Sequence, residues 1–222
     1  MNTKKTKHKK QRKLTVKEQK RLEIIIEKRT RLEAEGYTCH EKIFGALYVN
    51  IMTVIVMLPY VALMCVLFLF NNVGTKISLS LLNSPIANLA AIFIIFAILI
   101  VLHELIHGIF FALSVSTHWK SVEFGFNPVA CTPYCTCLEP LSKKSYIISA
   151  IMPTIFLGFL PSIIAVFSGN AFLFVIGLVM ILSGGGDFLM IYNLLKINSK
   201  KYDVLFLDHP TEIGSLIFIK EK

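Results

Sequence analysis

Long runs without a charged side chain dominate the hydrophobic and polar pattern of this chain. Three such runs lie between Lys42 and Lys76, between Lys76 and Glu104, and between Lys144 and Asp187. Each is longer than the roughly 20 residues that an α-helix needs to cross a bilayer. The last run has room for two helices joined by a turn at residues 168–170. We therefore expect four membrane helices, over residues 46–70, 87–115, 146–167 and 171–195.

Positive charge is concentrated outside these runs. Residues 1–42 hold fourteen Lys or Arg against six Glu, and most of the other lysines lie in the 116–145 loop or after residue 195. The loops on the opposite side contain only Lys76. The positive-inside rule therefore predicts a multi-pass protein of the cell membrane with both termini and the 116–145 loop in the cytoplasm. The expected organisation is a basic tail at 1–42, a membrane domain at 43–197 and a C-terminal tail at 198–222.

Composition favours a membrane protein over other classes. Hydrophobic residues make up 55% of the chain and charged residues 17%, whereas about a quarter of the residues in a soluble domain are charged. A soluble all-helical core would need polar stripes that these helices lack. The basic tail suits the anionic inner face of a bilayer, and no nucleic-acid-binding motif accompanies it. Residues 14–35 fit an amphipathic helix, on the membrane surface or in solvent, whose apolar side carries Leu22, Ile25, Ile26 and Leu32.

The loop after the second predicted helix has a different pattern. Val122, Phe124 and Phe126 alternate with other residues, and Asn127-Pro128 then turns the chain toward a segment that ends at Cys137. This pattern is typical of a short β-hairpin, and an amphipathic loop is the alternative. The predicted fold class is therefore an all-α integral membrane protein of about four transmembrane helices, with a short hairpin-like cytoplasmic loop over 122–137 between helices two and three.

The second predicted helix contains the motif His103-Glu104-Leu105-Ile106-His107. Its two histidines are one turn apart on the same face, so both can reach one zinc ion, and Glu104 can meet a water molecule beside that ion. An ionisable Glu with two His inside a membrane span is costly and marks a functional site. A polar cluster that only stabilises helix packing is the alternative. The motif predicts a zinc site with Glu104 as the catalytic base.

A catalytic zinc usually has three protein ligands, so the motif requires one more. After Glu104, Asp187 is the only charged residue inside a predicted span. His103 and Asp187 each lie about 16 residues, or roughly 24 Å, from the outer ends of their helices. We therefore expect Asp187 to be the third ligand, beside His103 and His107. This donor set suits zinc and also non-haem iron. Histidines in tails and loops, such as His209, are expected to be solvated.

The sequence resembles a bacterial family of integral membrane proteins classed as zincin peptidases, related in plan to the site-2 proteases. The resemblance covers roughly residues 33–219. It rests on the zinc motif at 103–108, on Phe124-Gly125-Phe126, on the segment 132–141, on Gly186-Asp187 and on the segment 208–214. It implies that His103, His107 and Asp187 bind zinc and that Glu104 is catalytic. Phe188 follows Asp187 where site-2 proteases commonly have Gly, and there is no room for a PDZ-type domain.

The sequence therefore predicts an intramembrane zinc metalloprotease that cleaves membrane-protein or signal-peptide-like substrates near the cytoplasmic face. The hairpin is expected to bind extended substrate by β-augmentation, with Phe124, Phe126 and Glu139 as substrate contacts. A solvated interfacial charge is the alternative for Glu139. A non-proteolytic membrane protein with a structural or regulatory metal site is the alternative function. A transporter fits less well, because four spans without a repeat are expected. No oligomeric state is predicted.

Overall fold

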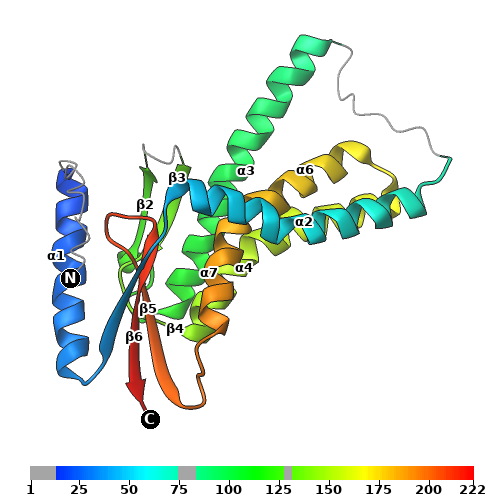
Figure 1. Cartoon of the computed structure of the whole chain (residues 1–222). Helices are drawn as coiled ribbons and strands as arrows, with labels where there is room; N and C mark the ends of the chain where they lie inside the picture. The colour runs from blue at the N-terminus through cyan, green and yellow to red at the C-terminus, as the bar shows by residue number, and fades with distance from the viewer. Residues whose placement is uncertain (1–13, 75–83, 128–131) are drawn as a thin grey trace, which may run out of the picture.

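The computed structural model describes residues 14–74, 84–127 and 132–222. Figure 1 shows two parts. One is a group of apolar helices, α2 to α7, which we call the helical part. The other, the sheet part, consists of a β-sheet and the N-terminal helix α1 beside it. A separate hairpin lies close to α3, where the two parts meet.

The helices follow the charge-free runs of the sequence. They are α2 (Ala46–Asn71), α3 (Pro85–Ser114), α4 (Lys143–Pro153), the π-helix η2 (Thr154–Phe159), α5 (Leu160–Ser168), α6 (Ala171–Ser183) and α7 (Gly185–Leu195). Three segments of the described chain are long and apolar enough to cross a membrane, namely α2, α3 and the continuous stretch 143–168. Helices α6 and α7 make a fourth if the pair counts as one span, although they are bent by 45°. The expectation of about four apolar spans is thus confirmed as three to four.

The helical part is apolar outside as well as inside. Phe68 of α2 and Phe174 of α6 stack with ring centroids 4.1 Å apart in a core that also contains buried residues of α5. On the outer surface, Leu69 and Phe93 remain 61% and 68% exposed. Exposed apolar surface of this extent suits contact with lipid rather than water. Toward its N-terminal end, α3 diverges from α2 and α6 (Figure 1).

The sheet part contains four antiparallel strands from distant segments of the chain. The strands are β1 (Thr38–Ile43), β4 (Leu141–Ser142), β5 (Tyr202–Asp208) and β6 (Gly214–Glu221). Their order across the sheet is β1-β6-β5-β4. The all-α fold class predicted from the sequence is therefore wrong in this respect. The physical reason is that strand pairing joins residues that the sequence separates, so short apolar runs near the chain ends gave no signal of a common sheet.

Both faces of this sheet are covered. Val204 and Phe206 of β5 pack with buried residues of α3, α4 and α7, whereas Leu205 and Leu207 pack toward α1. Alternate side chains of a strand point to opposite faces, so each face receives its own apolar row. Burial on both faces explains why this strand is a continuous apolar run rather than an alternating one.

Helix α1 (Val16–Ala34) covers the outer face of the sheet. A capping box starts it, in which Thr15 and Glu18 each bond to the other's backbone N–H. Ile25 and Leu32, two residues of the predicted apolar side, are 2% exposed and pack on Leu207, Leu216 and Phe218 of the sheet. The amphipathic helix expected at 14–35 is thus present. Ile25 and Leu32 face protein rather than a membrane surface or solvent, whereas Ile26 of the same predicted side is 52% exposed. The division of the chain into tails and a membrane domain stays a prediction.

The expected hairpin is confirmed. After the short 3₁₀-helix η1 (His118–Ser121), strands β2 (Val122–Asn127) and β3 (Thr132–Cys137) pair antiparallel. Phe124 lies opposite Cys135, and Phe126 lies opposite Pro133. The turn expected at Pro128 lies outside the described residues.

Candidate metal centre

His103 and His107 lie one turn apart on α3 and point to the same side. They are buried, with 8% and 7% of their surface exposed, and their Nε2 atoms are 3.2 Å apart. The Nδ1 atom of His107 lies 2.9 Å from the backbone carbonyl of Ser149 on α4. A carbonyl can only accept, so Nδ1 carries the proton and the Nε2 lone pair of His107 is left for a metal.

Asp187 reaches the two histidines from the first turn of α7. Its Oδ2 atom lies 3.4 Å from the Nε2 atom of each. The bend between α6 and α7 at Gly184 makes this approach possible. A Cβ at Gly184 would collide with Thr154 of η2, and a Cβ at Gly185 would collide with Thr53 of α2. Without side chains, these glycines let α7 pack closely on its neighbours and bring Asp187 to the histidines.

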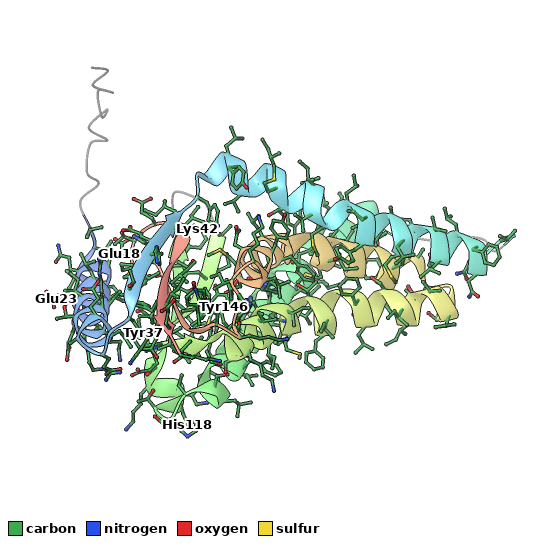
Figure 2. The ribbon with its side chains drawn as sticks, turned by 60° about the horizontal axis from the view of Figure 1, so that its bottom comes forward. Glu18, Glu23, Tyr37, Lys42, His118 and Tyr146 are labelled. Atoms are coloured by element: carbon green, nitrogen blue, oxygen red, sulfur yellow. The ribbon has the colours of Figure 1, made fainter. Side chains whose placement is uncertain are left out.

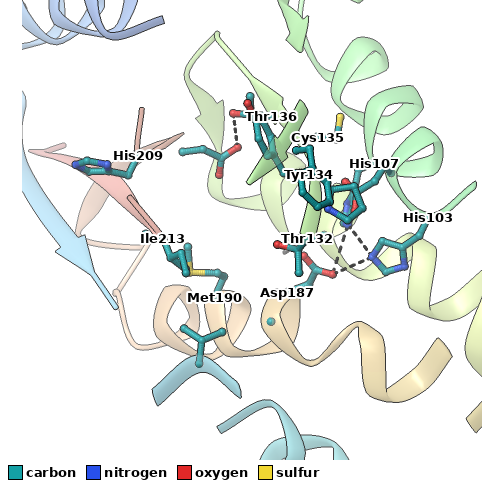
Figure 3. Close-up of a pocket in the computed structure, with 18 of the residues that line it drawn as sticks. His103, His107, Thr132, Tyr134, Cys135, Thr136, Asp187, Met190, His209 and Ile213 are labelled. Carbon is teal, nitrogen blue, oxygen red and sulfur yellow. Dashed lines mark hydrogen bonds and ion pairs between the residues drawn. The ribbon is translucent and has the colours of Figure 1, made fainter. Parts of the chain in front are cut away.

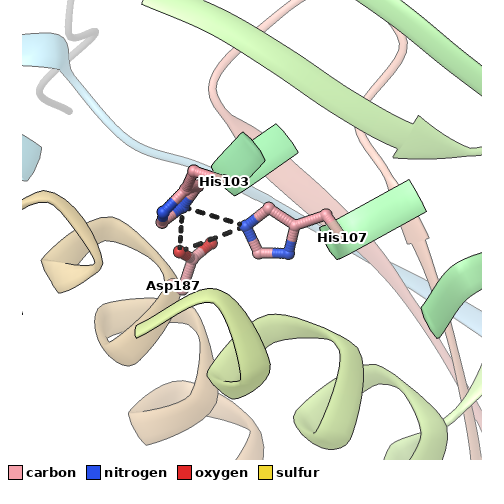
Figure 4. A group of neighbouring side chains, drawn as sticks. All are labelled: His103, His107 and Asp187. Atoms are coloured by element: carbon pink, nitrogen blue, oxygen red, sulfur yellow. Dashed lines mark hydrogen bonds and ion pairs between the residues drawn. The ribbon is translucent and has the colours of Figure 1, made fainter. Parts of the chain in front are cut away.

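The three side chains form a donor set for one metal ion (Figure 4). One ligand atom each from His103, His107 and Asp187 lies within 4.8 Å of the other two. Two imidazole nitrogens and one carboxylate oxygen match a catalytic zinc site, in which three protein ligands leave a fourth position open. The proton on His107 Nδ1 also suits metal binding at Nε2. The residues present therefore fit a zinc ion, and their role as ligands stays a prediction.

Glu104 lies beside His103 and meets the hairpin. The backbone N–H of Cys135 on β3 donates a hydrogen bond to its carboxylate. On the other edge of the hairpin, Lys17 Nζ donates to the carbonyl of Phe124 at 2.6 Å. Along two antiparallel strands, pairs of opposite residues alternate between two kinds. In one kind the backbone N–H and C=O groups bond to the opposite residue, and in the other they point away from the partner strand. Phe124 and Cys135 are an outward-directed pair, so the outer edge of β3 faces Glu104.

A cavity of about 620 Å³ contains these groups (Figure 3). Glu104 and the three donor residues lie in its wall. The rest of the wall comes from α1, α2, α4, α6, other residues of α3 and α7, the hairpin, the end of β5 and the turn at 209–214. Ligand sites of this size are usual for proteins, and the combination of apolar walls with a few convergent polar groups is typical of a binding or active site.

The three residues expected to contact substrate lie in different places. Phe126 lines the cavity. Phe124 packs on α3, where a Cβ added to Gly108 would lie 2.5 Å from its ring. Glu139 pairs with Lys28 of α1 at 2.7 Å. The structure therefore brings Phe126 to the cavity wall and leaves Phe124 and Glu139 outside it, and substrate contact stays a prediction for all three.

Asp208, at the end of β5, lines the cavity and had no assigned role in the sequence analysis. It accepts hydrogen bonds from Thr136 Oγ1 at 2.8 Å, from the Tyr146 hydroxyl at 3.2 Å and from the backbone N–H of Cys137. Burial raises the pKa of Asp208, although these hydrogen bonds oppose the shift. Tyr146 lies in the interior between helices and sheet (Figure 2). Asp208 thereby joins β3 to α4 at the cavity that contains the three donor residues.

His209, expected to be solvated rather than a metal ligand, lies outside the three-residue donor set but is less exposed than expected. Its side chain is 10% exposed, and its Nε2 atom lies 2.8 Å from Glu41 of β1. Its Nδ1 atom accepts a hydrogen bond from the backbone N–H of Glu212 at 2.9 Å. Ile213 in the same turn accepts one from the backbone of Phe44. These bonds fold the 209–214 turn against the start of the helical part, where it forms part of the cavity wall.

Comparison with known proteins gives one match. Residues 95–202, slightly less than half of the chain, match the model of a family described as "putative zincin peptidase". The matched segment contains His103, Glu104, His107 and Asp187, and it leaves out α1, α2 and β6. No curated protein and no solved structure matches the chain. The resemblance inferred from the motifs is thus confirmed over this segment, and the similarity to zincin peptidases implies a zinc metallopeptidase.

Proposed function

We propose that the protein is an intramembrane zinc metallopeptidase that hydrolyses peptide bonds of membrane-associated protein substrates near the cytoplasmic face. One observation carries this proposal. His103, His107 and Asp187 present ligand atoms within 4.8 Å of one another, with Glu104 beside them in the same cavity. A cluster that served helix packing alone would need neither a cavity at its side nor a carboxylate directed at a strand edge.

The residues of the cavity have separate tasks in this reaction. A zinc ion held by His103, His107 and Asp187 would polarise the scissile carbonyl and lower the pKa of a water molecule. Glu104 accepts the proton of the attacking water and passes it to the amine nitrogen when the C–N bond breaks. The hydrogen bond from Cys135 orients the Glu104 carboxylate for these transfers. The Ser149 carbonyl fixes the ring of His107.

Strand β3 supplies an edge for the substrate. A helix hides its carbonyl groups in its own hydrogen bonds, so a membrane segment must be extended before it is cleaved. By the alternation along the hairpin, Cys135 and Pro133 both belong to outward-directed pairs, and their carbonyl groups point to the outer edge of β3. An extended peptide that donates its N–H groups to these carbonyls would lie next to Glu104.

Charge and topology support a site near the cytoplasmic side. Residues of α1 and of the 209–214 turn line the cavity, so part of its wall belongs to the sheet part. The segment 1–42, which includes α1, holds fourteen of the 23 Lys and Arg residues. Basic segments remain on the cytoplasmic side of a membrane. Membrane proteins and signal-peptide-like segments that end or unwind at this face are the substrates that suit such a site.

Metal content and cleavage test the proposal together. Purified wild type should contain about one zinc ion per chain by elemental analysis. His103→Ala and Asp187→Ala should lose it. Glu104→Gln should keep the metal and the fold yet cleave membrane-protein reporters in proteoliposomes at least about a hundredfold more slowly, because it lacks the general base. Glu23→Gln, on the outer side of α1 (Figure 2), is the matched control and should behave as wild type.

Two outcomes would contradict the proposal. A Glu104→Gln protein as active as wild type would remove the assigned base. Zinc in wild type, with no cleavage of any reporter and a cellular phenotype that Glu104→Gln leaves intact, would favour a structural or regulatory metal site.

A further inference from the structure

Arg21 of α1 is buried, with 7% of its surface exposed, although α1 belongs to the basic N-terminal segment. Its guanidinium donates to both carboxylate oxygens of Glu123, at 3.1 and 3.2 Å. It also donates to the Tyr134 hydroxyl and, at 3.3 Å, to the carbonyl of Pro210. A buried charge is retained only where hydrogen bonds and an opposite charge replace water. The arrangement around Arg21 meets both conditions.

These partners come from three segments around one cavity. Glu123 lies on β2, Tyr134 on β3 and Pro210 in the 209–214 turn. Arg21, Tyr134 and Pro210 line the cavity that holds the metal centre. The fork of donors on a guanidinium suits such bridging, because it fixes several acceptors in one plane.

Tyr134 links Arg21 to the reacting groups. The Arg21 guanidinium lies 4.8 Å from the centroid of the Tyr134 ring, and a Cβ at Gly125 of β2 would collide with that ring. The ring is thus held between Arg21 and the neighbouring strand. The next residue, Cys135, donates its N–H to Glu104. A displacement of Tyr134 would therefore move the strand edge that faces Glu104.

Other contacts of α1 with this region are more exposed. Lys17 pairs with Glu123 at 3.2 Å, but 56% of its side chain is exposed. Exposed ion pairs contribute little to stability. Arg21 is consequently the most deeply buried of these contacts of α1 with the strands of the hairpin, whereas Lys28 pairs with Glu139 beyond the end of β3.

We infer that Arg21 is a positioning residue for the proposed peptidase site: from α1, it holds β3 at the position in which Cys135 meets Glu104. The role of Arg21 in catalysis rests on the proposed function, whereas its role in positioning the hairpin does not. Helix α1 then helps to position the site, although it lies outside the segment that matches the peptidase family.

Hydrogen exchange of the full chain in detergent, followed by mass spectrometry, tests this inference. In Arg21→Ala, we expect the backbone amides of 122–127 and 132–137 to exchange about tenfold faster, because the hairpin opens locally more often. Exchange in α2 and α6 should remain as in wild type. Arg29→Ala is the matched control, since Arg29 lies on the same helix in an exposed pair with Glu33 and should leave the hairpin unchanged.

Two milder variants keep the inference testable if Arg21→Ala does not fold. Tyr134→Phe removes only the hydroxyl acceptor, and Arg21→Lys keeps the charge without the fork of donors. Both should raise exchange of the hairpin by less than Arg21→Ala. Exchange of the hairpin at the wild-type rate in these variants would overturn the inference. Faster exchange throughout the chain would also overturn it, because it would show a general loss of stability rather than positioning.

Cleavage kinetics separate this inference from the proposed function. Arg21→Ala should retain zinc, raise KM, because the loosened edge strand binds substrate, and lower kcat, because the Cys135 N–H no longer orients Glu104. A smaller folded fraction alone would lower the apparent kcat and leave KM unchanged. If wild type does not cleave, the proposed function fails, and the exchange experiment still decides whether Arg21 positions the hairpin. If wild type cleaves and exchange is unchanged in the variants, only the inference about Arg21 fails.

Discussion

The helical part and the sheet part bury their apolar residues in different ways. On α2, Met57 is fully buried while its neighbour Leu58 is 57% exposed. On β5, Phe206 and Leu207 are also adjacent apolar residues, yet both are almost completely buried, with 0% and 1% of their surface exposed. The helical part thus leaves apolar side chains exposed on its surface, whereas the sheet part covers both of its faces with protein.

This difference separates two tasks at the metal centre. The helical part carries the three donor residues and Glu104, which lie on α3 and α7. The sheet part supplies Arg21 and Asp208, which hold the hairpin at the cavity. The position of the three donor residues therefore depends on how apolar helices pack, and the position of the hairpin at the cavity wall depends on contacts with the sheet part.

The largest expected effect tests the contact between the two parts. Phe206 packs on Phe111 and Tyr146 of the helices, with the Tyr146 ring centroid 5.6 Å from its own. Phe206→Ala should lower the free energy of unfolding by about 3–5 kcal/mol, because it leaves a cavity at a fully buried site. Thermal or denaturant unfolding in detergent measures this loss.

An exposed phenylalanine of the helical part is the matched control. Phe167 of α5 is 77% exposed, so Phe167→Ala should change stability by less than about 0.5 kcal/mol. Equal losses in the two variants would show that the two parts do not differ in how they bury apolar residues.

A smaller effect is expected where the helical part packs on itself. A Cβ at Gly185 would meet the backbone carbonyl of Thr53 and the side chain of Met57 at 2.9 Å, whereas a Cβ at Gly186 meets nothing within 4 Å. Gly185→Ala should therefore cost about 1–3 kcal/mol and weaken zinc retention, since α7 carries Asp187. Melting curves and zinc content after dialysis measure both effects.

Gly186→Ala provides the control for this prediction. It adds the same methyl group one residue along, where there is open space, and should leave stability within about 1 kcal/mol of wild type or raise it slightly. Loss of zinc in Gly186→Ala with full retention in Gly185→Ala would contradict the close packing of α7 on α2.

The sequence was sufficient for the features that depend on local pattern. Charge-free runs predicted the helices, because a membrane span requires about 20 apolar residues in succession. The spacing of His103 and His107 placed them on one helix face. Asp187 could be assigned to the same site from its distance to the outer end of its predicted helix, because a single carboxylate in an apolar run has few possible partners. The placement of these three residues agrees with that reasoning.

The features that depend on distant contacts were not predicted. The run Val204 to Leu207 is apolar on both faces and gives no period, so it could not be distinguished from part of a buried helix. Nothing in the sequence links β1 with β6 or Arg21 with Glu123. Asp208 directly follows this apolar run, and a carboxylate next to a buried strand was the available signal for its place at the cavity.

The smallest expected effect concerns the link between α1 and the sheet. The hydroxyl of Tyr37 donates to Asp203 Oδ2 at 2.6 Å, and this hydrogen bond, together with burial, raises the pKa of Tyr37 to about 12. The unfolded phenol titrates near pH 10, so the contribution of this bond is complete below about pH 10 and is lost as pH rises toward about 12. Tyr37→Phe should cost about 1 kcal/mol at neutral pH and show a shallower alkaline decline of melting temperature than wild type.

Tyr48→Phe on α2, outside the sheet part, is the control, and its melting temperature should decline in parallel with that of wild type. Parallel curves for wild type and Tyr37→Phe would show that the hydroxyl contributes nothing to the attachment of α1, and Arg21 with the apolar contacts of Ile25 and Leu32 would then account for it.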